Sequence, residues 1–254
     1  MFLDDFEGVE LDRDVWLPHY LPQWSSRGGS AATFAVERSR LRLTIPPGQG
    51  LWCAADHEPP LRVSGIQSGV FSGAPGSTVG QQPFRDGLVV REEQPAHWGW
   101  TPRFGRIEVC ARMELSPRSM ASVWLIGLEE VPQRSGEICL FEVFGDSIKD
   151  GPGGPVAAIG QGVHPFRDPV LTDDFAAAPH ALDVRDFHVY AADWLPGAVC
   201  FFIDGERVRR VSQAPDYPMQ LEVAVFDFPD RSSVAPSDHV PVLEVDWIRG
   251  TPPP

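Results

Sequence analysis

The chain has 254 residues, of which 43% are hydrophobic and 22% are charged, and this composition excludes a disordered or fibrous protein. Its 21 basic and 35 acidic residues give a formal net charge of −14. Nucleic acids are bound through clustered positive charge, so a nucleic-acid partner is not expected. No apolar run approaches the roughly 18 residues that a membrane span needs, and no membrane partner is expected either.

Glycine and proline set the fold class. The 24 glycines and 26 prolines are spread along the whole chain rather than gathered in one tract. Helices tolerate such residues poorly, whereas short strands joined by turns require them. We therefore expect an all-β protein with no helix longer than about two turns.

Alternation of apolar and polar residues predicts the individual strands. In chain order they cover residues 41–45, 107–113, 199–203, 206–211, 223–226 and 242–249. Asp204 and Gly205 separate two of these segments and are the strongest hairpin signal in the chain. The stretches 72–86 and 146–181 are expected to be long irregular loops. We predict a single domain over residues 1–250 and a disordered tail over 251–254.

The four cysteines bear on the redox environment. Cys53, Cys110, Cys139 and Cys200 are widely spaced and form no C-x-x-C pair. Reduced thiols in the core are the first expectation, and one or two disulfides in a secreted protein are the alternative. The first residues show no signal-peptide pattern, so we expect a cytoplasmic protein, or a secreted one if a leader has been removed.

Two glutamates in an apolar segment point to catalysis. Residues 135–144 read SGEICLFEVF, with Glu137 and Glu142 five positions apart. A buried glutamate is costly unless it is paired or faces a cleft. An odd spacing directs the two side chains to opposite faces of a regular strand, but a β-bulge between them restores the same face. Paired carboxylates about 5 Å apart are the machinery of retaining glycosidases. The alternative is an edge strand with one glutamate in solvent and the other in a salt bridge.

The same segment resembles the E-x-D-x-x-E active-site strand of glycoside hydrolase family 16, the group that contains laminarinases, lichenases and agarases. Other segments resemble further strands of this family in the same order, namely 4–8, 104–109, 122–125, 186–194 and 245–249. The resemblance implies a curved two-sheet antiparallel β-sandwich, a concanavalin A-like jelly roll, with a glycan cleft on its concave face. We expect a polysaccharide or oligosaccharide as the partner, and a monomeric protein.

The resemblance also implies a retaining endo-β-glycanase that hydrolyses β-1,3- or β-1,3/1,4-linked glucan. By position Glu137 is the nucleophile and Glu142 the general acid/base. His164 falls where members of the family often carry a cleft histidine, and simple solvation is the alternative for it.

Departures from the family pattern suggest a second function. Cys139 stands where the motif has aspartate, and Met120 stands where the family often has a tryptophan at the sugar. A neutral thiol adds no negative charge beside the glutamates, so we expect slow hydrolysis and an acid-shifted pH optimum. A weakly active or inactive jelly roll that binds glycan without cutting it is the alternative.

Aromatic and acidic residues complete the candidate sites. Trp98, Trp100 and Trp124 are candidates for substrate binding, with packing as the alternative. The mechanism requires no cofactor. Asp5 and Asp246 match positions at which the family often binds a structural calcium, although two carboxylates supply only part of a shell of 6–8 oxygens.

Overall fold

In the part of the chain that the structure describes, seventeen strands make up nearly all the regular structure. The structure is a computed structural model that describes residues 1–234 and 238–253. One sheet, the cleft sheet, contains β4 (Arg62–Gln67), β8 (Ser119–Gly127), β9 (Glu137–Phe144), β10 (Lys149–Gly151), β11 (Gly154–His164), β12 (Asp174–His180) and β16 (Met219–Asp227). The other, the backing sheet, contains β1 (Phe2–Asp4), β2 (Thr33–Val36), β3 (Leu41–Thr44), β7 (Gly105–Glu114), β13 (His188–Leu195), β14 (Ala198–Ile203), β15 (Glu206–Val211) and β17 (Val242–Thr251). The short strands β5 (Gly69–Val70) and β6 (His97–Trp98) pair separately, and α1 (Arg27–Ser30) is a single helical turn.

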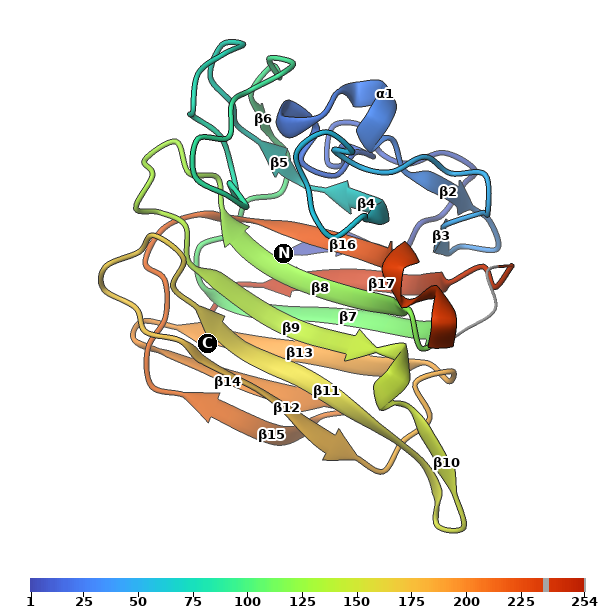
Figure 1. Ribbon diagram of the computed structural model, residues 1–254. Coiled ribbons are helices and arrows are strands. Elements are labelled where there is room, and N and C mark those ends of the chain that lie inside the picture. Colours follow the sequence, from blue (N-terminus) through green and yellow to red (C-terminus); the bar gives the residue numbers. More distant parts are fainter. Residues whose placement is uncertain (235–237, 254) are drawn as a thin grey trace.

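The two sheets lie face to face in an antiparallel sandwich (Figure 1). The strand order is β10-β11-β9-β8-β16-β4 in the cleft sheet, with β12 beside β11. In the backing sheet the order is β15-β14-β13-β7-β17-β3-β2, with β1 beside β17. The predicted all-β two-sheet sandwich is confirmed.

Two apolar clusters hold the molecule together. The larger cluster fills the space between the sheets and includes Val123, Leu125 and Phe141. The smaller one lies on the outer face of the cleft sheet, where Trp124 and other strand residues meet side chains from the first 90 residues. Successive residues of a strand point to opposite faces, so the cleft sheet supplies apolar side chains to both clusters. Its central strands β8, β9 and β16 are therefore apolar at most positions.

The alternating strands and the hairpin are where the sequence predicts them. Asp204 and Gly205 have φ angles of 51° and 82°, as a tight hairpin turn requires. Residues 72–86 are irregular apart from an isolated bridge between Ser72 and Gly80.

The prediction of a loop over residues 146–181 is wrong, because β10, β11 and β12 lie within this stretch. Its glycines and alanines have low strand propensity, and tertiary packing overrides that propensity. Gly160 shows the reason, since a Cβ atom there would lie 2.3 Å from Cζ of Phe175. The strand needs small residues to accommodate the aromatic ring.

The C-terminal boundary differs by one residue from the prediction. Strand β17 continues through Thr251, which pairs with Arg106 of β7, although the tail was predicted to begin at residue 251. Pro254 lies outside the described residues. The four cysteines are unpaired; three are buried and Cys200 is partly exposed. Within the described residues, no helix has the length and apolar character to cross a bilayer.

We expect Asp227→Asn to lower the free energy of unfolding by about 3–5 kcal/mol, because it leaves the Arg118 guanidinium buried and uncompensated. The side chains of Arg118 and Asp227 are 7% and 5% exposed and form two hydrogen bonds of 2.5 Å that join the turn before β8 to the last residue of β16. Urea unfolding measures the effect. Asp216→Asn is the matched control, since Asp216 forms an exposed pair with Arg103 and its loss is expected to cost less than about 1 kcal/mol.

Candidate active site

A β-bulge in β9 places three chemically active side chains on one face. Val123 of β8 pairs with Phe141, and the next residue, Trp124, pairs with Cys139, so Leu140 is the extra residue of β9. The pairing with β11 shows the same shift. Leu140 and Phe141 both enter the core between the sheets. The side chains at positions 137, 139 and 142 consequently share the outer face of the cleft sheet, which confirms the bulge that the sequence analysis required.

Glu137 and Glu142 line one pocket on this face, which we call the glutamate pocket. It has a volume of about 220 Å³. The other residues that line it are Tyr20, His57, Leu61, Gln82, Met120, Ser122, Trp124, Phe226 and Phe228. The two carboxyl groups therefore meet a shared cavity rather than open solvent. The edge-strand alternative is wrong, since β9 lies between β8 and β11.

Burial disfavours the ionised forms of both glutamates. Burial raises the pKa of Glu137 to about 8, and the negative charge of Glu142 adds to the rise. Burial also raises the pKa of Glu142, against the opposing effect of His164. Two neighbouring carboxyl groups in a desolvated pocket do not both ionise readily. Near neutral pH the pair holds a proton, which is the condition that general acid catalysis requires.

Cys139 occupies the position between the two glutamates. It is 1% exposed, and its Sγ atom lies 3.9 Å from the carbonyl oxygen of Gly160. Burial, followed by the charges of Glu137 and Glu142, raises the pKa of the thiol well above its ordinary value. The thiol is therefore neutral. Both glutamate pKa values are nevertheless raised, which argues against the acid-shifted optimum expected from the sequence.

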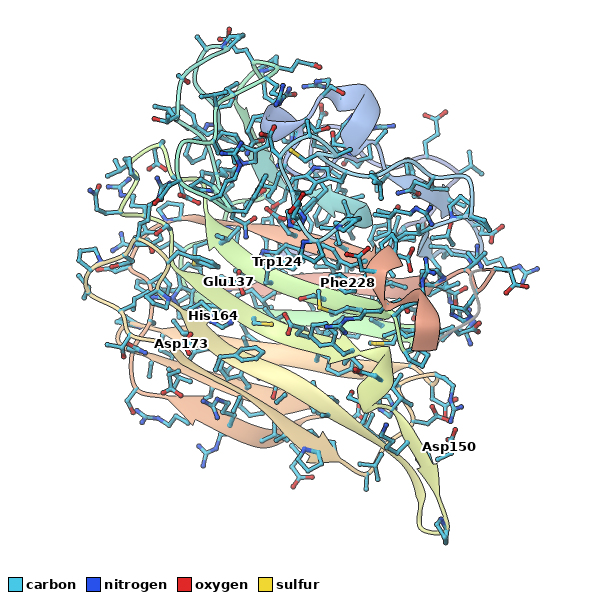
Figure 2. The ribbon with its side chains drawn as sticks, viewed as in Figure 1. Trp124, Glu137, Asp150, His164, Asp173 and Phe228 are labelled. Atoms are coloured by element: carbon cyan, nitrogen blue, oxygen red, sulfur yellow. The ribbon has the colours of Figure 1, made fainter. Side chains whose placement is uncertain are left out.

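His164 lies beside the pair and is held by its neighbours. It faces Glu137 in the register of β11 and β9. Its Nδ1 atom lies 2.6 Å from Oδ1 of Asp173, and its ring stacks on Phe175 with centroids 4.6 Å apart. Figure 2 shows Trp124, Glu137 and His164 on neighbouring strands of the cleft sheet. His164 is therefore oriented by its neighbours rather than simply solvated, but it does not line the glutamate pocket, and its role in substrate binding stays a prediction.

Only one of the three candidate tryptophans lines the glutamate pocket. Trp124 does so, and its Nε1 atom is buried without a hydrogen-bond partner. Trp98 is 47% exposed on β6 and does not line the pocket. The prediction for Trp100 is wrong, because its ring stacks on Phe2 at 4.2 Å and packs over Gly250 of the backing sheet. Aromatic residues near each other in sequence were separated by the fold.

Asp5 and Asp246, the two carboxylates considered for calcium, differ in their surroundings. Oδ1 of Asp246 accepts a hydrogen bond of 2.9 Å from Nε of Arg40, which supplies its counter-charge. Asp5 accepts only a weak bond of 3.4 Å from the backbone of Glu7. Among the described residues, no group of three or more His, Cys, Asp or Glu side chains is placed to hold a metal ion. The mechanism below relies on the side chains of this chain alone.

Further polar groups lie on the cleft sheet and on the loops beside it, outside the motif that contains Glu137 and Glu142. Glu222 of β16 is 1% exposed and pairs in register with Trp124, and its Oε2 atom has no partner. Burial raises its pKa well above the ordinary value. A glutamate inside the apolar run 221–225 is the same signal that identified Glu137, and it was available in the sequence. Tyr20 and Gln82 come from irregular segments that carry no such signal.

Comparison with known proteins identifies the family. The model of glycosyl hydrolases family 16 matches residues 100–248, which is more than half of the chain. The chain belongs to glycosyl hydrolases family 16. No curated protein matches the sequence.

Solved structures support the same jelly-roll fold. The GlcNAcα1-4Gal-releasing endo-β-galactosidase from Clostridium perfringens is 24% identical with a TM-score of 0.79, over 98% of this family 16 chain and 62% of the other. This chain thus spans about three fifths of that protein. The laminarinase catalytic domain from Thermotoga petrophila RKU-1 is 15% identical with a TM-score of 0.64, over 98% and 96% of the two chains. The laminarinase from Rhodothermus marinus is 17% identical with a TM-score of 0.65, over 99% and 96%.

The raised pKa of Glu137 predicts a pH-dependent stability of this glycoside hydrolase. The pKa rises from 4.5 to about 8 on folding. Between these values the folded state binds more protons than the unfolded state, so stability falls as pH rises through this window. We expect Glu137→Gln to melt at about the wild-type temperature at pH 4 and roughly 5 °C or more above it at pH 9. Thermal unfolding across pH measures this. Asp216→Asn should keep the wild-type pH dependence, and a constant difference for Glu137→Gln at all pH values would contradict the assignment.

Proposed function

We propose that this family 16 glycoside hydrolase is a retaining endo-acting β-glycanase in which Glu137 is the nucleophile and Glu142 the general acid/base. One observation carries the proposal: the bulge in β9 brings the two buried carboxyl groups to the same pocket. A retaining mechanism needs two carboxyl groups that act on opposite ends of one glycosidic bond. The roles follow the order of the two glutamates in the family motif.

In the first step a carboxylate oxygen of Glu137 attacks the anomeric carbon. The bond from this carbon to the leaving oxygen breaks, and Glu142 transfers its proton to that oxygen. In the second step Glu142 takes a proton from water, the water oxygen attacks the anomeric carbon, and the bond to Glu137 breaks. Both carboxyl groups return to their initial states.

The transition state favours the proton on Glu142. In the free protein burial raises the pKa of both glutamates, so the shared proton is not yet committed to the acid. Positive charge develops on the sugar beside Glu137 as the glycosidic bond breaks, and this charge stabilises the Glu137 anion. The proton is then held by Glu142, next to the leaving oxygen.

The proposed substrate is a β-linked glycan. A β-1,3- or β-1,3/1,4-glucan is the expectation from the family motif. A β-galactoside-containing glycan is the second candidate, and it is favoured by the TM-score of 0.79 to an endo-β-galactosidase against 0.64 to a laminarinase. Polysaccharides of each class, tested side by side for reducing-end release, distinguish the two.

We expect Glu137→Gln and Glu142→Gln each to lower kcat on the hydrolysed glycan by at least about 10²-fold, since each removes a group that acts in the transition state. Azide is expected to restore activity to Glu137→Ala, because the smaller side chain leaves room for azide as a replacement nucleophile. Phe187→Ala is the control, because Phe187 lies just before β13, packs against Arg40 and Arg112 and does not line the glutamate pocket. If the wild-type protein binds glycan but releases no reducing ends from any of the polysaccharides tested, the result would instead support a jelly roll that binds glycan without cutting it.

Cys139→Asp tests the role of the residue between the glutamates. We expect this variant to hydrolyse the glycan faster than the wild type, because an aspartate orients Glu137 by hydrogen bonding and its charge raises the pKa of the acid further. Cys139→Ser is the matched control, as it keeps the size and adds no charge. The pH profile of kcat/KM is the readout. A slower Cys139→Asp variant with an unchanged melting temperature would contradict this role.

A further inference from the structure

A buried tyrosine and a buried aspartate meet at the backbone of the residue before Glu137. Tyr217 precedes β16 and is 9% exposed, Asp168 follows β11 and is 7% exposed, and neither lines the glutamate pocket. We propose that Tyr217 and Asp168 are positioning residues that hold the backbone that carries Glu137, and that catalysis depends on this restraint. The proposal rests on the glycanase function above, in which Glu137 is the nucleophile.

Two short hydrogen bonds run from the start of β9 to the loop after β11. The N–H of Gly136, the residue before Glu137, donates a hydrogen bond of 2.7 Å to the hydroxyl oxygen of Tyr217. This hydroxyl in turn donates 2.7 Å to Oδ2 of Asp168. The other carboxylate oxygen of Asp168 accepts 2.9 Å from the N–H of Val170. Both oxygens of the carboxylate are therefore engaged, and its orientation is fixed.

The Tyr217 hydroxyl forms the shorter of two hydrogen bonds to the backbone of Gly136. The carbonyl oxygen of Gly136 accepts a bond of 3.3 Å from the N–H of Gly127, at the end of β8. Burial, followed by the hydrogen bond to Asp168, raises the pKa of Tyr217 above its ordinary value, so the hydroxyl keeps its proton and both donates and accepts. A Cβ atom at position 136 would lie 2.7 Å from the tyrosine oxygen and 2.5 Å from Cδ1 of Leu171. Glycine is thus required for this close approach.

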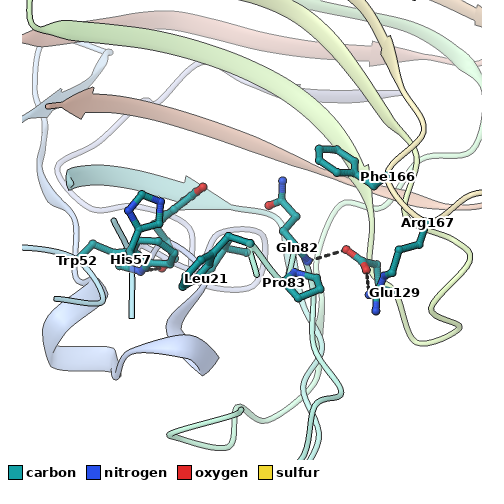
Figure 3. Close-up of a pocket in the computed structure, with 10 residues that line it drawn as sticks. Leu21, Trp52, His57, Gln82, Pro83, Glu129, Phe166 and Arg167 are labelled. Carbon is teal, nitrogen blue, oxygen red and sulfur yellow. Dashed lines mark hydrogen bonds and ion pairs between the residues drawn. The ribbon is translucent and has the colours of Figure 1, made fainter. Parts of the chain in front are cut away.

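The loop after β11 is fixed by the same stretch of chain. The N–H of Arg167 donates 2.8 Å to Oγ of Ser135, and the guanidinium of Arg167 forms an ion pair with Glu129. Figure 3 shows Phe166 and Arg167 in the wall of a cavity of about 370 Å³, which shares lining residues with the glutamate pocket. Ser135 and Gly136 therefore join the loop to the start of β9, and the two segments are fixed relative to each other.

The position of Glu137 in its strand makes this restraint relevant to catalysis. Glu137 is the first residue of β9, so Gly136 is the residue that fixes where the strand begins. A displacement of about 1 Å in a reacting group costs about 10²-fold in rate. A tyrosine that contributed only to folding would change the stability alone. A tyrosine that positions Glu137 also changes kcat and the solvent exposure of the Glu137 carboxyl group.

Kinetics of two variants test the restraint. Tyr217→Phe keeps the ring and removes the hydroxyl, so we expect a melting temperature about 3–8 °C lower, a kcat about tenfold lower and a KM within about twofold of the wild type. Asp168→Asn has one oxygen for two donors, and a smaller decrease of kcat is expected. Tyr190→Phe is the matched control, because the buried Tyr190 hydroxyl has no hydrogen-bond partner and its removal should leave kcat and KM unchanged.

A double-mutant cycle across pH tests the restraint without any hydrolysis. Glu137→Gln is expected to raise the melting temperature at pH 9, because folding raises the pKa of Glu137 to about 8. In a Tyr217→Phe background Glu137 is better solvated and its pKa moves back towards 4.5, so this gain should fall to about half or less. The titratable groups around Glu137 are the same in both backgrounds and cancel in the comparison: Tyr20, Cys139, Glu142, His164 and Glu222.

The cycle separates this proposal from the proposed function. A smaller gain at pH 9 in the Tyr217→Phe background than in the wild-type and Tyr190→Phe backgrounds supports the positioning role, even if the wild type hydrolyses no glycan. An equal gain in all three backgrounds, or no gain in any, overturns it. An active wild type whose kcat is unchanged by Tyr217→Phe overturns it as well. If Tyr217→Phe does not fold, Asp168→Asn takes its place in the cycle.

Discussion

The single extra residue in β9 is the constraint on which the catalytic arrangement depends. In a strand without a bulge, Glu137 and Glu142 would face opposite sides, and one of them would enter the apolar layer between the sheets. With the bulge, Leu140 and Phe141 both fill that layer. The energy that the core gains from two successive apolar side chains therefore fixes the direction of both glutamates.

The neighbouring strand accommodates this irregularity with small residues. Gly160 of β11 lies opposite Glu142, and the ring of Phe175 covers it. The same ring stacks on His164, which faces Glu137. Because Gly160 has no side chain, the ring of Phe175 can pack against the backbone there and stack on His164. The packing of β11 against β12 thus orients this histidine.

Three glutamates of the cleft sheet are mostly or fully buried. Glu137, Glu142 and Glu222 all have raised pKa values because burial disfavours their charged forms. A carboxyl group whose pKa is raised on folding lowers the free energy of unfolding at neutral and alkaline pH. Other interactions in the sheet must therefore compensate for this loss. The buried pair of Arg118 and Asp227 and the core between the sheets provide that support.

The sequence by itself determined the fold class, the alternating strands, the hairpin at Asp204 and the pair Glu137 and Glu142, since each depends on local periodicity or on a glutamate inside an apolar run. It did not reveal β11 and β12, because their many glycines and alanines carry little local strand signal and Gly160 of β11 is required by the ring of Phe175 in β12. Tertiary structure alone decided that Trp100 packs on the backing sheet while Tyr20 and Gln82 reach the catalytic pair. The physical reason is that side chains from irregular segments are placed by long-range packing, which spacing along the chain does not encode.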